Sequence, residues 1–93
     1  MTKGIITSGI MTQDMVGRIV ISKTGHDKDC AYVVIKERDR LVTLVDGAKR
    51  TFSNPKKKNK LHIMNTNSFV DDIANCEDGE IRKVLLRFRK GEV

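Results

Sequence analysis

The fold is decided by residues 16–35, which read VGRIVISKTGHDKDCAYVVI. Residues 17–23 and 30–36 are rich in Val, Ile and Tyr, the residues that strands favour. Between them, residues 24–29 form a cluster of Thr, Gly, His, Asp and Lys, which is typical of a turn. The stretch therefore predicts two antiparallel strands joined by a polar turn.

The second of these strands is apolar on both faces. Alternate side chains point to opposite sides, with Tyr32 and Val34 on one face and Ala31, Val33 and Ile35 on the other. A strand that is apolar on both sides suits a small closed barrel better than a sheet with one solvated face.

A third strand is expected at residues 41–45, which read LVTLV. Asp46 and Gly47 follow, a pair that favours a tight reversal because glycine accepts a positive φ. The short connections between the three strands predict an antiparallel meander. Residues 61–64, LHIM, form a short alternating run that returns to the sheet.

The C-terminal part of the chain predicts a helix. Ile81, Val84, Leu85 and Phe88 are spaced i, i+3, i+4 and i+7, along one face of a helix. Acidic residues precede this stripe and basic residues follow it, an order that complements the helix dipole. Gly91 lies at the position where a helix commonly ends. We expect this helix to pack on the barrel; an interaction surface or a membrane-surface helix are the alternatives.

The chain is expected to form one small domain with three parts. Residues 1–14 are an extension that could add an edge strand, residues 15–66 form the barrel, and residues 67–93 form an acidic connector and the amphipathic helix. Ninety-three residues bury only a modest core, which leaves little room for a deep substrate cavity.

The charge balance indicates a polyanionic partner or an anionic surface. Lys and Arg number 18 against 12 Asp and Glu, a net charge of +6; the alternative is ordinary solubility charge. Cys30 and Cys76 are the only cysteines, as suits a reducing cytosol. No apolar run approaches the roughly 20 residues that span a bilayer, and the first residues do not resemble a signal peptide. We expect a cytoplasmic protein.

The most basic segment is residues 49–60, which we expect to be a phosphate-binding loop. It contains the chain's only proline, Pro55, which with Asn54 argues against a continuous central strand. Binding by such a cluster depends strongly on salt, because each neutralised phosphate releases counterions. The expected phosphate contacts are Lys49, Arg50, Lys56, Lys57, Lys58 and Lys60.

The turn after the first strand is the second predicted contact edge. It offers Lys23, His26 and Lys28 together with Gly25, whose missing Cβ lets a sugar-phosphate chain approach. The alternative is that Gly25 only solves a turn geometry.

Aromatic side chains are scarce. Phe52, within the basic segment, is the expected base-stacking residue, whereas Tyr32 and Phe88 are expected in the core. Few stacking groups and many lysines favour recognition of the shape and backbone of a nucleic acid over its base sequence.

No pattern predicts a metal, a cofactor, a small-molecule substrate or catalysis. His26, Cys30, His62 and Cys76 are scattered, without the spacing of zinc ligands. The acidic residues near position 78 are expected to cap the helix and to complement its dipole.

Residues 16–35 resemble the KOW motif of ribosomal proteins and transcription-elongation factors. The matching residues are Gly17 to Lys23, Gly25 with Asp27 and Lys28, Tyr32 to Val34, Leu44 to Gly47, Arg50, and Pro55 to Lys58. Over residues 15–66 the pattern is similar to the KOW-containing RNA-binding proteins of bacteria, relatives of large-subunit ribosomal proteins. Many members carry a second glycine where this chain has Asp29.

The resemblance implies a mainly β fold, an SH3-like barrel of the KOW type, followed here by the C-terminal helix. It also implies binding of RNA, often ribosomal RNA, without catalysis. The leading hypothesis is therefore a ribosome-associated RNA-binding protein. The alternative is a protein-interaction module that docks a ribosomal or transcription component.

Overall fold

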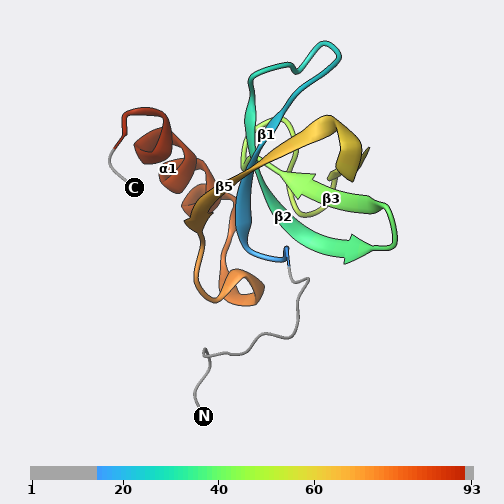
Figure 1. Cartoon of the computed structure of the whole chain (residues 1–93). Coiled ribbons are helices and arrows are strands. Elements are labelled where there is room, and N and C mark those ends of the chain that lie inside the picture. Colours follow the sequence, from blue (N-terminus) through green and yellow to red (C-terminus); the bar gives the residue numbers. More distant parts are fainter. Residues whose placement is uncertain (1–14, 92–93) are drawn as a thin grey trace.

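The computed structural model describes residues 15–91, and these form a twisted antiparallel sheet with a helix beside it (Figure 1). The expected edge strand within residues 1–14 lies outside the described residues. The elements in chain order are β1 (Arg18–Ser22), β2 (Ala31–Arg38), β3 (Leu41–Val45), β4 (Lys56–Asn59), the 3-10 turn η2 (Lys60–His62), β5 (Ile63–Phe69), the 3-10 turn η3 (Ile73–Asn75) and α1 (Asp78–Arg89).

The mainly β fold with a C-terminal helix is confirmed, and so is the meander of the first three strands. β1 pairs with β2 and β2 with β3, both antiparallel. The complete order is β4-β3-β2-β1-β5, so the first and last strands of the chain lie side by side.

Both faces of the central part of the sheet carry buried clusters, as the two-sided apolar pattern of β2 predicts. On one face the side chains of β1, β2 and β3 pack against Ile81 and Leu85 of α1. The side chains of the opposite face form a second cluster, and Val20, Val34 and Leu44 in it are 0% exposed. No described helix covers this second cluster, so the sheet must curl around it.

Among residues 15–91 the four ladders of the curled sheet are not joined by a fifth that would close it. In this part of the chain the pairing runs from β4 to β5 without joining these two edges. η2 connects them instead, because its ends bind neighbouring turns. The Lys23 amide donates to the His62 carbonyl at 2.8 Å, and the Lys60 amide donates to the Arg40 carbonyl at 2.8 Å.

Two segments differ from their expected extents, whereas the acidic, capped start of the helix is confirmed. Lys56–Asn59, expected as part of a loop, is an edge strand. Pro55 comes just before this strand, where its missing N–H does not break a hydrogen-bond ladder. β5 begins only at Ile63 and continues to Phe69, so a domain boundary at residue 66 cuts through it. α1 starts before the apolar stripe because Glu77 and Glu80 form a capping box there.

Gly47 fixes how closely α1 approaches the sheet. Its φ is +79°, and a Cβ built on it would lie 2.3 Å from the Asp78 carbonyl oxygen and 2.7 Å from the Arg82 nitrogen. The Asp78 carboxylate also accepts a hydrogen bond of 2.9 Å from the Phe52 amide. The first turn of α1 is therefore seated directly on the connection that follows β3.

We expect Gly47→Ala to lower the free energy of unfolding by about 2–5 kcal/mol, because it adds left-handed strain and a backbone clash. Gly79→Ala is the matched control, since nothing lies within 4 Å of its Cβ position and alanine favours a helix by up to about 1 kcal/mol. Urea denaturation measures both. Equal stability of the two variants would show that α1 does not depend on the close approach at Gly47.

Candidate nucleic-acid interface

The connection between β1 and β2 projects from the sheet at the top of Figure 1. Lys23, His26 and Lys28 are all exposed on it. Gly25 is also exposed and has a φ of +85°. This connection, residues 23–30, is called the hairpin tip below.

Asp29 stands in the hairpin tip at the position where the sequence resemblance leads to the expectation of a glycine. It adopts a φ of 72°, in the left-handed region that Asp tolerates better than most other residues. The position keeps the backbone conformation that glycine favours, but it adds an exposed carboxylate next to Lys28.

The other acid of the hairpin tip, Asp27, is turned inward. Its side chain is only 13% exposed and accepts hydrogen bonds from the Ser22 hydroxyl at 2.9 Å and the Tyr32 hydroxyl at 3.0 Å. Its carboxylate also binds the ammonium groups of Lys58 at 2.9 Å and Lys56 at 3.5 Å. This cluster, called the Asp27 cluster below, joins the hairpin tip to β4.

The charge of Asp27 is strongly stabilised in the folded protein. Burial by itself raises the pKa of this carboxyl, but the hydrogen bonds from Lys58, Ser22 and Tyr32 outweigh burial and hold the pKa well below its ordinary value. Burial raises the pKa of Tyr32, and its hydrogen bond to the Asp27 carboxylate raises it further. Tyr32 therefore stays a hydrogen-bond donor.

We expect Asp27→Asn to cost about 1.5–3 kcal/mol of folding free energy at pH 7, where the wild-type carboxylate is ionised. Because the folded-state pKa is below the unfolded value of 3.8, the ionised cluster stabilises the fold above about pH 4 and loses this effect as the pH falls. The difference between wild type and variant should shrink from pH 5 to pH 2 in urea titrations. A constant difference would mean that Asp27 carries no special charge stabilisation.

The cations of residues 49–60 do not form one free basic loop, so that prediction was wrong. Side chains alternate along β4: Lys56 and Lys58 point toward Asp27, whereas Lys57 is exposed on the other face. Lys60 binds the Glu37 carboxylate, which also accepts a hydrogen bond from the Met15 amide.

The hydrogen bonds from Lys60 and Met15 hold the pKa of Glu37 below its ordinary value, against the effect of burial, which is the largest single influence. Its charge therefore neutralises Lys60 at neutral pH.

Lys49 and Arg50 lie in the connection between β3 and β4. Asp46 shapes this turn, since its carboxylate accepts hydrogen bonds from the amides of Ala48 and Arg50 at 2.9 and 2.8 Å. Lys49 is exposed and Arg50 is half-buried. Within residues 15–91 neither side chain forms an ion pair.

The expected stacking residue is not free. Phe52 packs against the core cluster under α1, as Phe88 does, and Tyr32 is buried in the second cluster. The exposed aromatic ring is Phe69, at 53%, which the sequence pattern did not indicate. Arg18, its partner across β1 and β5, places its guanidinium carbon 4.4 Å from the ring centroid. Only the strand register reveals this pair.

A groove of about 790 Å³ lies between the start of α1, η3 and β2. Val16, Ile35, Phe52 and Ile73 give it apolar walls, and Glu77 and Asp78 lie at its acidic side. Burial, followed by the charges of Glu80 and Asp72, raises the pKa of the Cys76 thiol in this groove. The thiol is therefore not activated as a nucleophile.

Within residues 15–91, no three His, Cys, Asp or Glu side chains are grouped so as to hold a metal ion. In the same residues no helix has the length and apolar character needed to cross a bilayer. No protein-family model matches the chain, and no curated protein matches it.

Proposed function

We propose that this protein binds RNA without catalysing a reaction, and that the hairpin tip is one of its phosphate-contacting edges. The observation that supports this proposal most is that an acidic side chain of the tip is buried and paired, while the basic side chains of the tip are exposed. Asp27 is turned inward and bound by lysines of β4, while Lys23, His26 and Lys28 are exposed and form no ion pair within residues 15–91.

The Asp27 cluster also makes the hairpin tip a suitable binding element. It holds the tip against β4 through the Asp27 carboxylate and through a hydrogen bond of 3.0 Å from Lys58 to the Thr24 carbonyl. A preorganised surface loses less conformational entropy when it binds. A Cβ at Gly25 would face this cluster, 3.5 Å from the Asp27 carboxylate and 3.8 Å from the Lys58 ammonium, so the glycine, with its φ of +85°, shapes the turn over the Asp27 cluster.

Charge elsewhere on the molecule supports the same function. Residues 71–80 hold five acids and no Lys or Arg, so the negative charge is concentrated beside α1, away from the hairpin tip in Figure 1. Tyr32 is buried, Phe52 and Phe88 pack against the core, and the exposed ring among residues 15–91 is Phe69, which Arg18 contacts. The scarcity of exposed rings favours contacts with phosphate and sugar over base stacking. The choice of RNA, and of ribosomal RNA within it, rests on the KOW resemblance of the sequence.

The double variant Lys23→Gln/Lys28→Gln tests the hairpin tip. Loss of two phosphate contacts should lower the slope of log affinity against log salt by about 1.4–1.8 for structured RNA, measured by gel shift between 50 and 300 mM salt. Lys83→Gln/Lys90→Gln, in α1 and at its C-cap, is the control of equal charge, since both lysines are exposed. An equal decrease of the salt slope in the two variants would show that the hairpin tip has no specific role. Absence of RNA binding by the wild type would refute the proposed function.

The groove beside α1 favours a second candidate function, docking of a protein. Its apolar walls and acidic side suit a basic, partly apolar segment of a ribosomal or transcription protein. Affinity purification with and without ribonuclease separates the two functions: RNA binding predicts that partners are lost after nuclease treatment. Partners that persist after nuclease, and are lost on Ile73→Asp, would favour docking.

A further inference from the structure

Helix α1 covers only part of the sheet face that it packs on. Val33 and Val45, paired across β2 and β3, lie under the helix. The β2–β3 register then shifts between Val34 and Lys36. Beyond this bulge the same face continues toward the end of the β2–β3 hairpin, where no described element covers it.

The strand register aligns the side chains of this uncovered part in two rows. Lys36 lies opposite Thr43, and Thr43 lies opposite Lys57. The next row joins Arg38 to Leu41 and Leu41 to Asn59. We call these six residues the open sheet face.

The cations of the open sheet face have no acid among them. Lys36, Arg38 and Lys57 are exposed and form no ion pair within residues 15–91. Glu37 points to the opposite side of the sheet, where it binds Lys60. Leu41, between the two rows, is 47% exposed.

The three consecutive lysines of β4 therefore have different roles. Lys58 is 10% exposed and bound to Asp27, and Lys56 is 28% exposed and bound to the same carboxylate. Lys57 points away from both. A phosphate that approaches the open sheet face meets the charge of Lys57, whereas Lys56 and Lys58 lie on the opposite face of the sheet, where Asp27 binds both ammonium groups and offsets one of their two charges.

We propose that the open sheet face is a second RNA-contacting surface, which binds the sugar-phosphate backbone of duplex RNA. The inference rests on the proposed function and extends it from the hairpin tip to a separate face. Neighbouring strands are about 4.8 Å apart, so the Cα atoms of Lys36 and Lys57 are separated by roughly 10 Å. Their long side chains can contact more than one phosphate across that span.

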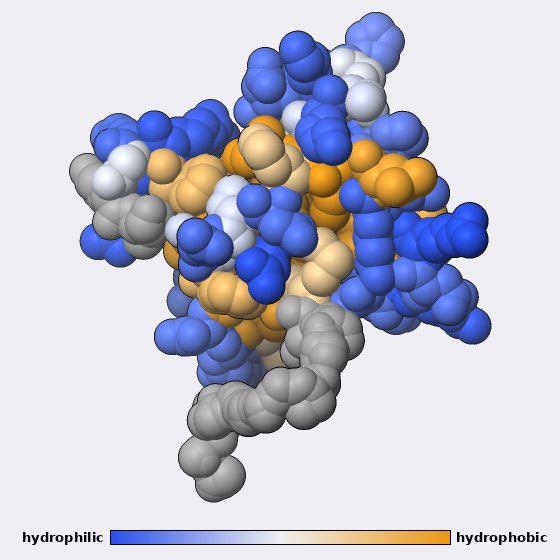
Figure 2. All heavy atoms as spheres, in the orientation of Figure 1, coloured by the Kyte–Doolittle hydropathy of each residue, from blue (hydrophilic) through white to orange (hydrophobic). Residues whose placement is uncertain are grey.

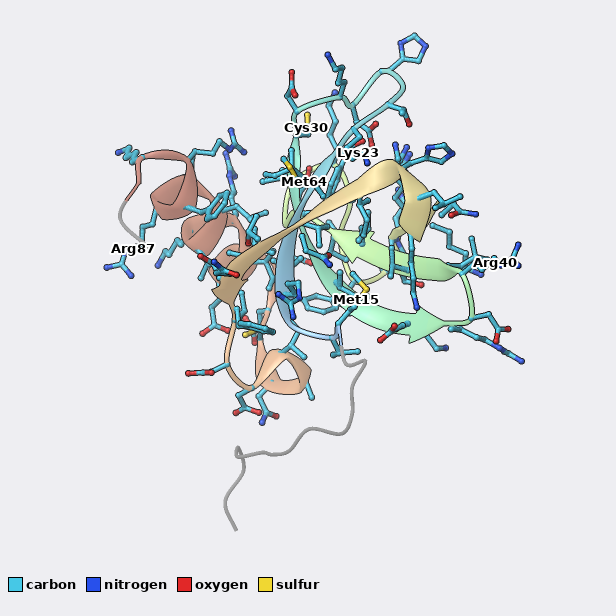
Figure 3. All side chains as sticks on the ribbon, in the orientation of Figure 1. Met15, Lys23, Cys30, Arg40, Met64 and Arg87 are labelled. Atoms are coloured by element: carbon cyan, nitrogen blue, oxygen red, sulfur yellow. The ribbon has the colours of Figure 1, made fainter. Side chains whose placement is uncertain are left out.

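The other side chains of the face favour a duplex over a single strand. Thr43 and Asn59 can bond ribose hydroxyl groups, and Leu41 can pack against a sugar. The face has no aromatic residue, and single strands are commonly held by stacking on aromatic rings. Duplex RNA is recognised instead through its shape, its phosphates and its 2′-hydroxyls. Arg40, labelled in Figure 3, extends the cationic surface at the end of the β2–β3 hairpin, a region that is hydrophilic in Figure 2.

Two neighbouring single variants test the inference. Lys57→Gln should lower the salt slope for a hairpin duplex RNA by about 0.7–0.9 and the affinity at low salt several-fold. Lys56→Gln removes the same charge one residue away, but should leave the slope nearly unchanged, because that ammonium lies on the opposite face of the sheet, directed toward Asp27. The triple variant Lys36→Gln/Arg38→Gln/Lys57→Gln should lower the slope by about 2–2.7.

The outcomes separate this inference from the proposed function. If the wild type binds RNA and the hairpin-tip variant weakens it, but the triple variant has an unchanged slope, only the open sheet face is refuted. Equal effects of Lys56→Gln and Lys57→Gln would refute the assignment of faces. Tighter binding of an unpaired poly-U strand than of the duplex would refute the substrate class.

Amide chemical shifts of the wild-type protein provide a readout that needs no variant. Titration with duplex RNA should shift the amides of residues 36–43 and 56–59. A titration that moves only residues 23–30 would contradict the second surface, while still supporting the hairpin tip.

Discussion

The arrangement of this protein depends on one half-buried carboxylate. Asp27 lies in the turn between the first two strands, and it binds Ser22, Tyr32, Lys58 and Lys56. These partners come from three strands, so a single side chain ties the projecting turn to both the centre and the edge of the sheet. A buried charge is tolerated only when it is paired and hydrogen-bonded, and here every bond of the carboxylate also braces the hairpin tip.

A second constraint decides which surfaces remain open. Gly47 lets the first turn of α1 approach the connection after β3, and this places the helix over one part of the sheet only. The apolar side chains under it form the core, and the rest of that face keeps the polar and cationic side chains of β2, β3 and β4. The position of the helix thus separates the buried half of this face from the half available to a ligand.

Much of the fold follows from the residues alone. Runs of β-branched residues with short turns predict the three-strand meander, and the stripe of Ile81, Val84, Leu85 and Phe88 predicts the helix. These patterns are local, and they depend on the period of the backbone. Pro55 weakened the prediction of β4, because its position just ahead of an edge strand looks like a loop in the sequence.

The sequence by itself determined the first three strands, the helix, the positive charge and the turn that bears Gly25 and Asp27. Only the tertiary structure decided which cations are free. The sequence does not distinguish Lys56, Lys57 and Lys58 from one another. In the structure, strand alternation and the register with β3 direct two of them toward Asp27 and one toward solvent. For the same reason Phe52, the expected stacking residue, packs against the core, while Phe69, which no pattern indicated, is exposed. Contacts between residues distant in the chain set the environment of each charge and ring, and no local pattern contains that information.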